Sequence, residues 1–294
     1  MSEAGQPSVS TVRPKLPFAM DDIPLFLGLG VLAVPTLASL GKQVWTTEAG
    51  AHGPIVLAVG AWLLVRELAA SKSFVKPGSF LLTLAGLVFS LAVYVFGRAF
   101  DFISLEVAGL YGAAVSLLYS RIGMRALRHL WFPVFYLAFL IPPPGWFIDQ
   151  FTAPLKQFVS WASMSSLSAV GIPVAREGVT IYVAAYRLLV EDACSGLNSL
   201  VGLIAVSLLY IYLLRGSNVR YAALLVAATI PIAVLGNILR IMTLILLTYF
   251  FGDEVAQGFL HQAAGMFLFA VDLLLVFALD RLLWGILPKS WKSA

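Results

Sequence analysis

Charged residues are scarce in this sequence. Asp, Glu, Lys and Arg make up 12% of the 294 residues, whereas hydrophobic residues make up 60%. A soluble domain carries about 25% charged residues, and so few charges cannot cover a solvated surface. Because a membrane helix takes about 20 apolar residues, the composition predicts an all-α polytopic membrane protein with about eight transmembrane helices.

Cysteine and histidine are also rare. The chain has one cysteine and three widely separated histidines, His52, His129 and His261. A single cysteine excludes a disulfide framework and any multi-cysteine metal site, and the histidine spacing does not favour a zinc centre. We therefore expect no metal and no cofactor. The net charge of +4 indicates loop orientation in a bilayer, and no nucleic-acid partner is expected.

The apolar runs predict the membrane topology. Thirteen of the 19 basic residues fall on one side of the resulting map, five on the other, and Arg240 falls within a span. The positive-inside rule then places both termini in the cytoplasm. The expected spans are residues 23–41, 54–71, 79–97, 102–120, 130–148, 194–214, 221–250 and 262–284.

The rest of the chain is expected to be two short tails and one long loop. Residues 1–22 are polar and proline-containing and predict a disordered cytoplasmic tail, and residues 286–294 form a second cytoplasmic tail. Residues 23–285 are expected to form a single transmembrane domain. Within it, residues 149–193 are too long for a simple connection and form an outer loop.

This outer loop has two recognisable parts. Phe151, Leu155, Phe158 and Ala162 recur at helical spacing, which predicts a helix lying in the membrane interface. Valine, isoleucine and tyrosine are enriched around Glu177, which predicts a short β-hairpin before the sixth helix.

Cys194 is the first residue that can carry chemistry. It follows the loop at the start of the sixth span, where the positive end of a helix dipole favours a thiolate. Asp192 can cap this helix, and Asn198 lies four residues beyond the cysteine. The alternative is that Cys194 is only a small buried apolar residue.

Arg240 is the second candidate because it lies inside the seventh span. A charged residue there is costly and points to function by default. The alternative is a structural ion pair, for which Asp272, 11 residues into the eighth span, is the expected partner. Asn237 precedes Arg240 by three residues on the same helical face and can orient Arg240 or a substrate carbonyl.

His261 opens the eighth span and is the third candidate. An imidazole can act as acid or base near neutral pH, although a histidine at this position can also be a purely interfacial residue. Together, Cys194, Arg240 and His261 supply the thiol, the cation and the base that acyl transfer through a thioester requires. All three are expected in the outer half of the membrane.

Several short motifs resemble the exosortase/archaeosortase family of polytopic membrane cysteine transpeptidases. They are ACSGL at 193–197, GNILR at 236–240, the proline-rich IPPPGW, and the histidine that opens the last span. The resemblance covers roughly residues 20–285. It implies that Cys194 is the nucleophile, Arg240 the family's arginine and His261 the third catalytic residue. It also implies membrane-anchored protein substrates with a C-terminal sorting tail: a short motif such as PEP, one membrane helix and a basic cluster.

The expected function is cleavage of such tails through an acyl-thioester and transfer of the product to an acceptor. The expected location is a bacterial inner membrane, with the site toward the outer face and residues 149–193 forming a substrate groove. Two alternatives stay open: a membrane protease that only hydrolyses, and a transporter that uses Arg240 and Asp272. The oligomeric state is also open. Substrate-binding or supporting roles are expected for Asn237, Asn198, Asp192 and Asp272.

Overall fold

The structure of the chain is a computed structural model. The structure describes residues 23–47, 50–71, 75–177, 180–183, 186–189, 200–216, 219–252 and 259–286. Cys194, Asp192, Asn198 and the terminal tails lie outside these residues, and of His261 only the backbone is described. The chain divides into two compact units, the first formed by residues 1–35 and 58–138 and the second by residues 36–57 and 139–294.

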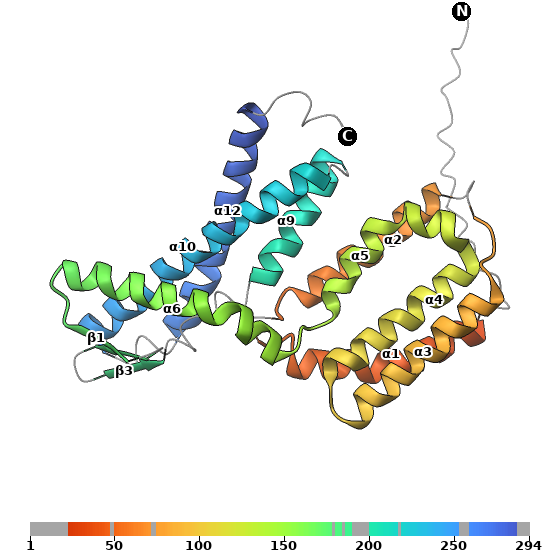
Figure 1. Cartoon of the computed structure of the whole chain (residues 1–294), viewed down its shortest axis with the longest axis horizontal. Coiled ribbons are helices and arrows are strands. Elements are labelled where there is room, and N and C mark those ends of the chain that lie inside the picture. Colours follow the sequence, from red (N-terminus) through yellow and green to blue (C-terminus); the bar gives the residue numbers. More distant parts are fainter. Residues whose placement is uncertain are drawn as a thin grey trace, which may run out of the picture. The chain divides into compact units, whose positions relative to one another are not determined.

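Helices dominate the described part of the chain (Figure 1). The elements in chain order are α1 (Ile23–Gln43), α2 (Gly53–Ala70), α3 (Phe80–Ala99), α4 (Ile103–His129), α5 (Trp131–Leu137), the 3-10 turn η3 (Ala138–Leu140), α6 (Gly145–Ala169), β1 (Val174–Glu177), β2 (Thr180–Val183), β3 (Tyr186–Leu189), α9 (Leu200–Arg215), α10 (Val219–Phe251) and α12 (Phe259–Ile286).

The chain is a multi-pass membrane protein. Five of its helices, α1, α2, α3, α4 and α10, are long and apolar enough to cross a bilayer. A sixth span is obtained if α5–η3 and α6 are counted as one bent span, whereas α9 is apolar but has only 16 residues. The described residues therefore give five to six candidate spans against the eight expected.

The fifth span expected over residues 130–148 is wrong in its boundaries. The helical segment that starts at Trp131 ends at Leu140, and a new helix starts at Gly145. Pro142, Pro143 and Pro144 lie in the gap; proline supplies no N–H for a helical hydrogen bond and clashes with the preceding turn. Helix α6 then continues without interruption to Ala169, so the interfacial helix expected from residue 151 is part of a longer element.

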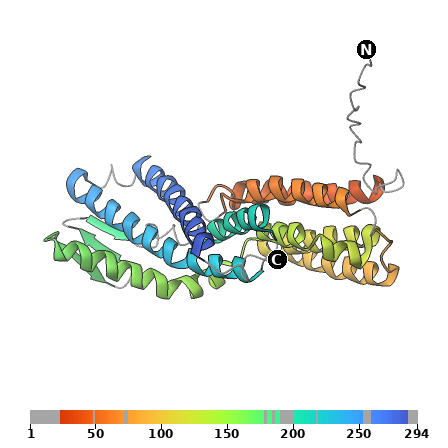
Figure 2. The ribbon, with the colours of Figure 1, turned by 90° about the horizontal axis from the view of Figure 1, so that it is seen from above.

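In the first unit, α3 and α4 form a tightly packed pair, seen side by side in Figures 1 and 2. Glycines allow the close approach: a Cβ on Gly97 would meet the backbone of Glu106, and a Cβ on Gly109 would meet the backbone of Tyr94. Arg98 Nη1 donates a hydrogen bond of 2.7 Å to Glu106 Oε1 beside this contact. Small residues at such a crossing are typical of membrane helix packing.

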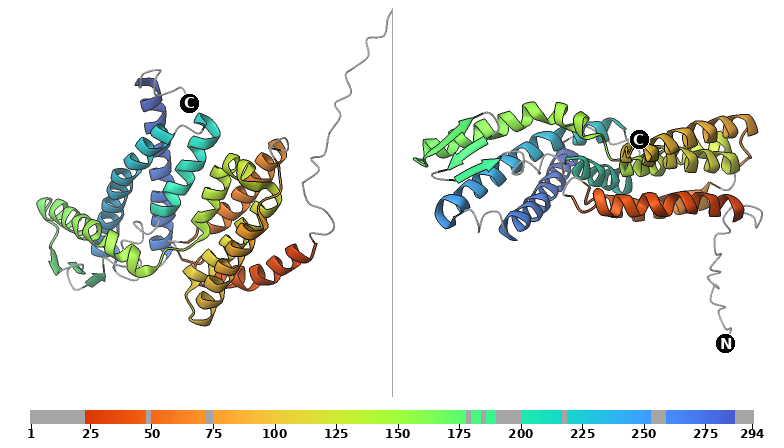
Figure 3. Two further views of the ribbon diagram at one scale, coloured as in Figure 1. Left: turned by 45° about the vertical axis from the view of Figure 1, so that its right-hand side comes forward. Right: turned by 90° about the horizontal axis from the view of Figure 1, so that it is seen from below.

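In the second unit, α10 is the central helix. It contacts α6 on one side and both α9 and α12 on others, and Figure 3 shows α9, α10 and α12 side by side. The face of α6 that is buried carries small and polar residues, including Thr152, Ser160 and Ser163, whereas Phe151 and Phe158 are exposed. Ser163 Oγ donates to the Ile238 carbonyl of α10 at 3.3 Å.

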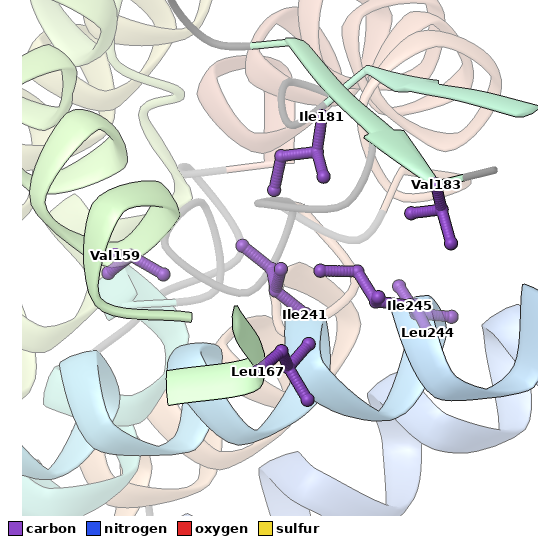
Figure 4. Packing of buried hydrophobic residues seen from close by; sticks show 7 residues of the cluster. All are labelled: Val159, Leu167, Ile181, Val183, Ile241, Leu244 and Ile245. Carbon is purple, nitrogen blue, oxygen red and sulfur yellow. The ribbon is translucent and has the colours of Figure 1, made fainter. Parts of the chain in front are cut away.

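A three-stranded antiparallel sheet with the order β1-β2-β3 follows α6, where the sequence predicts a single hairpin. It packs against α6 and α10 through a buried aliphatic cluster (Figure 4). The cluster draws on α6, β2 and α10 and consists of Val159, Leu167, Ile181, Val183, Ile241, Leu244 and Ile245.

In β1, Arg176 and Glu177 are exposed charged residues. The stretch of α10 that packs against the sheet includes Ile241 and Ile245.

A buried charged cluster joins α9, α10 and α12 at the other end of α10. Asp280 of α12 is fully buried and accepts hydrogen bonds from Arg215 Nη2 at 2.8 Å and Tyr210 Oη at 2.9 Å. Tyr221 Oη of α10 donates to the same carboxylate. The Arg215 guanidinium carbon also lies 4.0 Å from the centroid of the Trp284 ring. Arg215, expected to serve only loop orientation, is thus a structural residue of this cluster.

Candidate active site

The candidate site is built on α10 and α12. Arg240 and Asn237 lie on the buried face of α10, where Arg240 is 3% and Asn237 2% exposed. Their spacing of three residues places them on one side of the helix, as the sequence predicts. Ile241, the next residue, is part of the cluster beneath the sheet, so Arg240 lies at the level of the sheet.

Arg240 is held against a glycine of α12. A Cβ on Gly265 would lie 3.0 Å from Arg240 Nη2 and 3.2 Å from its guanidinium carbon. A side chain at position 265 would therefore shift the guanidinium from its present place. His261 lies four residues before Gly265 in α12, and residues at this spacing share a helix face. The backbone therefore places position 261 one turn away from the contact made by Arg240.

Asp272 makes a reciprocal contact one turn away from Arg240 along α10. A Cβ on Gly236 would overlap the Asp272 carboxylate. Asp272 Oδ1 is buried and accepts no hydrogen bond from any described residue. The ion pair between Asp272 and Arg240 that the sequence suggests is not among those formed by the described residues. The sequence suggests this pair because Arg240 and Asp272 lie at a similar distance from the ends of their helices. The sequence does not give the rotation of α12 about its axis.

Asn237 is the most unusual polar group of the site. Both its side-chain oxygen and its side-chain nitrogen are buried, and neither has a hydrogen-bond partner among the described residues. A buried amide without partners is costly, because its desolvation is not compensated. A polar group outside the described residues, or a substrate, can supply these partners.

A further histidine of the second unit, His52, lies in the segment between α1 and α2 and contacts the start of α9. A Cβ on Gly202, in the first turn of α9, would lie 3.2 Å from Nδ1 of His52. Position 202 is eight residues beyond Cys194. Sequence reasoning missed this contact, because His52 and Gly202 are 150 residues apart and no motif links them.

Of the expected site residues, the structure brings Asn237, Arg240 and Asp272 to the α10–α12 contact. Cys194 lies outside the described residues. No group of three or more His, Cys, Asp or Glu residues that could hold a metal ion is found within the described residues. The arrangement supplies a buried cation and a buried amide, the kind of preorganised donors that can stabilise a developing oxyanion.

Comparison with known proteins identifies the family. The model of the transmembrane exosortase family matches residues 44–278, which include α2 through most of α12. No curated protein and no solved structure matches the chain. Since the family model covers most of the sequence, the resemblance seen in its motifs is confirmed: the chain belongs to the transmembrane exosortases, membrane transpeptidases or proteases that act on membrane-anchored proteins.

Proposed function

We propose that the protein is a membrane cysteine transpeptidase that removes C-terminal sorting tails. One observation carries the proposal: in a chain of the exosortase family, α10 buries Arg240 and, three residues before it, the Asn237 amide, whose two polar atoms have no partner among the described residues. A peptide carbonyl and its N–H groups are suitable partners for such donors and acceptors. The substrate tail has a motif such as PEP, one membrane helix and a basic end.

In this proposal the topology has eight spans with both termini in the cytoplasm of a bacterium. The site then faces the outer surface of the inner membrane. A substrate anchored by its own helix, with its basic end in the cytoplasm, presents its motif at the same surface. Anchoring removes much of the entropic cost of bringing the two proteins together.

The chemical steps follow from the residue types. The Cys194 thiolate attacks the carbonyl carbon of the scissile peptide bond, and Arg240 stabilises the negative charge on the carbonyl oxygen. The C–N bond then breaks and the amine of the tail takes a proton, for which His261 is the expected donor. An amine, a hydroxyl or water then attacks the thioester carbon and gives its proton to His261, and the C–S bond breaks with Cys194 leaving as thiolate. Arg240 acts through its charge and its hydrogen-bond donors.

The sheet is the proposed docking surface for the sorting motif. Its two edges are β1 and β3, and β3 ends at Leu189, five residues before Cys194 in the sequence. An extended peptide can add to such an edge through main-chain hydrogen bonds. We propose that residues 149–193 form the substrate groove in this way, with the motif paired to β3.

Supporting roles are proposed for four further residues. Asn237 binds a substrate carbonyl, and Asp192 and Asn198 position the segment around Cys194. Asp272 packs against Gly236 and keeps α10 and α12 in register at the site. No transport role is proposed for Arg240 and Asp272, since the exosortase family provides no support for it.

The decisive experiment is to trap the thioester. The protein is incubated in lipid vesicles with a tailed substrate, and the adduct at Cys194 is identified by peptide mass analysis. Cys194→Ala must abolish both the adduct and cleavage. Normal processing by that variant would rule out the nucleophile. The mass of the released product separates transfer to an acceptor from hydrolysis, because hydrolysis adds only water.

The base is tested with two histidine variants in parallel. His261→Ala is expected to lower cleavage, whereas His52→Ala, at the other histidine of the second unit, is expected to leave it near the wild-type rate. The reverse result would move the acid–base role to His52. Arg240→Lys keeps the charge but loses the planar fork of donors, so we expect a loss on the order of a hundredfold in kcat/KM.

A further inference from the structure

The first unit contains a cavity that the proposed catalysis does not use. It has a volume of about 220 Å³ and lies between α1, α2, α4 and α5. Its walls are apolar and include Leu29, Leu64 and Val115. The Tyr111 hydroxyl at the cavity donates a hydrogen bond of 2.7 Å to the Val134 carbonyl, so it is already satisfied within the protein.

The shape of the cavity follows α4. Tyr111, Ala114, Leu118 and Arg121 all line it, and their spacing of three to four residues forms a stripe along one helix face. The stripe extends over ten residues, which corresponds to ~15 Å at the helical rise. Arg121 is the last residue of the stripe and the only charged residue in the lining.

An apolar cavity of this size does not fill with water. Apolar cavities of ~150 Å³ stay dry and bind apolar molecules, and an empty cavity costs stability in proportion to its volume. In a bilayer the apolar molecules at hand are lipid chains. An apolar cavity with a cation in its lining matches an apolar chain that ends in an anionic headgroup.

Two further basic residues follow Arg121 in the sequence and favour an anionic ligand. Arg125 and Arg128 follow beyond a kink in α4 at Gly123, and both are exposed. In the proposed topology this end of α4 faces the cytoplasm, where anionic lipids attract basic groups near the membrane. We propose that the cavity binds one anionic phospholipid, with an acyl chain between α1, α2, α4 and α5 and the phosphate at Arg121.

The test uses the full-length protein in detergent with added phosphatidylglycerol, or phosphatidylcholine that has the same acyl chains. Phosphatidylglycerol is expected to raise Tm by about 3 °C at a tenfold excess over its Kd, and native mass spectrometry should detect one bound phospholipid. Phosphatidylcholine is expected to give a smaller shift. Equal shifts from both lipids would disprove the headgroup site.

Variants separate the chain from the headgroup. Ala114→Phe fills the cavity and should abolish the shift, whereas Ala85→Phe adds the same ring to an exposed position of α3 and should not. Arg121→Gln should remove the preference for phosphatidylglycerol, while Arg121→Lys and the neighbouring Arg125→Gln retain it. If Ala114→Phe still binds the lipid, or instead dissociates a dimer of this chain, the cavity does not hold lipid. Failure of this test leaves the proposed catalysis untouched, because the variants lie outside the second unit.

Discussion

Arg240 of α10 lies against Gly265 of α12, so closely that a Cβ at that glycine would come within 3.0 Å of the guanidinium nitrogen. The contact defines where the cation is held in the proposed oxyanion site. It also makes residue 265, which has no chemical role of its own, a sensitive probe of catalysis.

Gly265→Ala is expected to lower kcat/KM for tail cleavage by roughly tenfold to a hundredfold, because small misplacements of a catalytic group are costly. Tm should change little, since the flexible end of the Arg240 side chain can move aside. The matched control is Gly285→Ala in the same helix, where a Cβ meets nothing within 4 Å. Equal cleavage by the two variants would show that the position of Arg240 is unimportant.

Asn237→Leu separates binding from folding. The two polar atoms of Asn237 have no partner among the described residues, so replacing it with an apolar residue of similar size loses no hydrogen bond to them. We expect Tm to stay the same or rise, while cleavage falls by at least about tenfold. Thr229→Val, at a buried position two turns earlier, is the control and should keep activity. A variant that is less stable but fully active would contradict the substrate-binding role.

Gly236→Ala should destabilise the contact between α10 and α12, because its Cβ would overlap the Asp272 carboxylate. Overpacking of this kind costs about 1–3 kcal/mol. Asp272→Ala alone removes a buried carboxyl whose Oδ1 has no partner and should be neutral or stabilising. The double variant should then be more stable than Gly236→Ala. Thermal unfolding of the four proteins forms a double-mutant cycle, and strictly additive effects would rule out the contact.

The Arg215–Asp280 cluster gives a prediction about stability. Arg215→Met leaves the fully buried Asp280 without its cation and should cost about 3–5 kcal/mol. Replacing both partners, in Arg215→Met with Asp280→Leu, should restore much of that loss. Arg281→Met, at the exposed neighbouring position, is the control. Denaturant or heat titrations in lipid bicelles provide the measurement, and the hypothesis fails if the single and double variants are equally unstable.

The sequence predicted the helices of the second unit better than their contacts. Helical periodicity placed Asn237 and Arg240 together on one face of α10, and the seventh span expected over residues 221–250 is close to the observed Val219–Phe251. The contact of Asp272 with Gly236 was not predicted, because apolar runs report depth but not the rotation of one helix against another. In a lipid environment both faces of a helix are apolar, so amphipathic patterning does not reveal which face is buried.

The third strand of the sheet and the charged cluster around Asp280 were also not predicted from the sequence. A hairpin was expected near Glu177, but the third strand, β3, carries no separate turn signal in the sequence that distinguishes it from an extended loop. Arg215 was counted with the basic residues that orient loops, since only the fold brings it to Asp280, 65 residues later. Cys194 and His261 remain predictions from motif and position.

The two glycine contacts together restrict how α12 can move. Arg240 occupies the space above Gly265, and Asp272 occupies the space above Gly236, so each helix inserts one side chain into a notch of the other. Sliding of α12 along α10 would require both side chains to leave these notches. We therefore expect the two helices to stay paired when a substrate enters, with the adjustment in the elements that flank them.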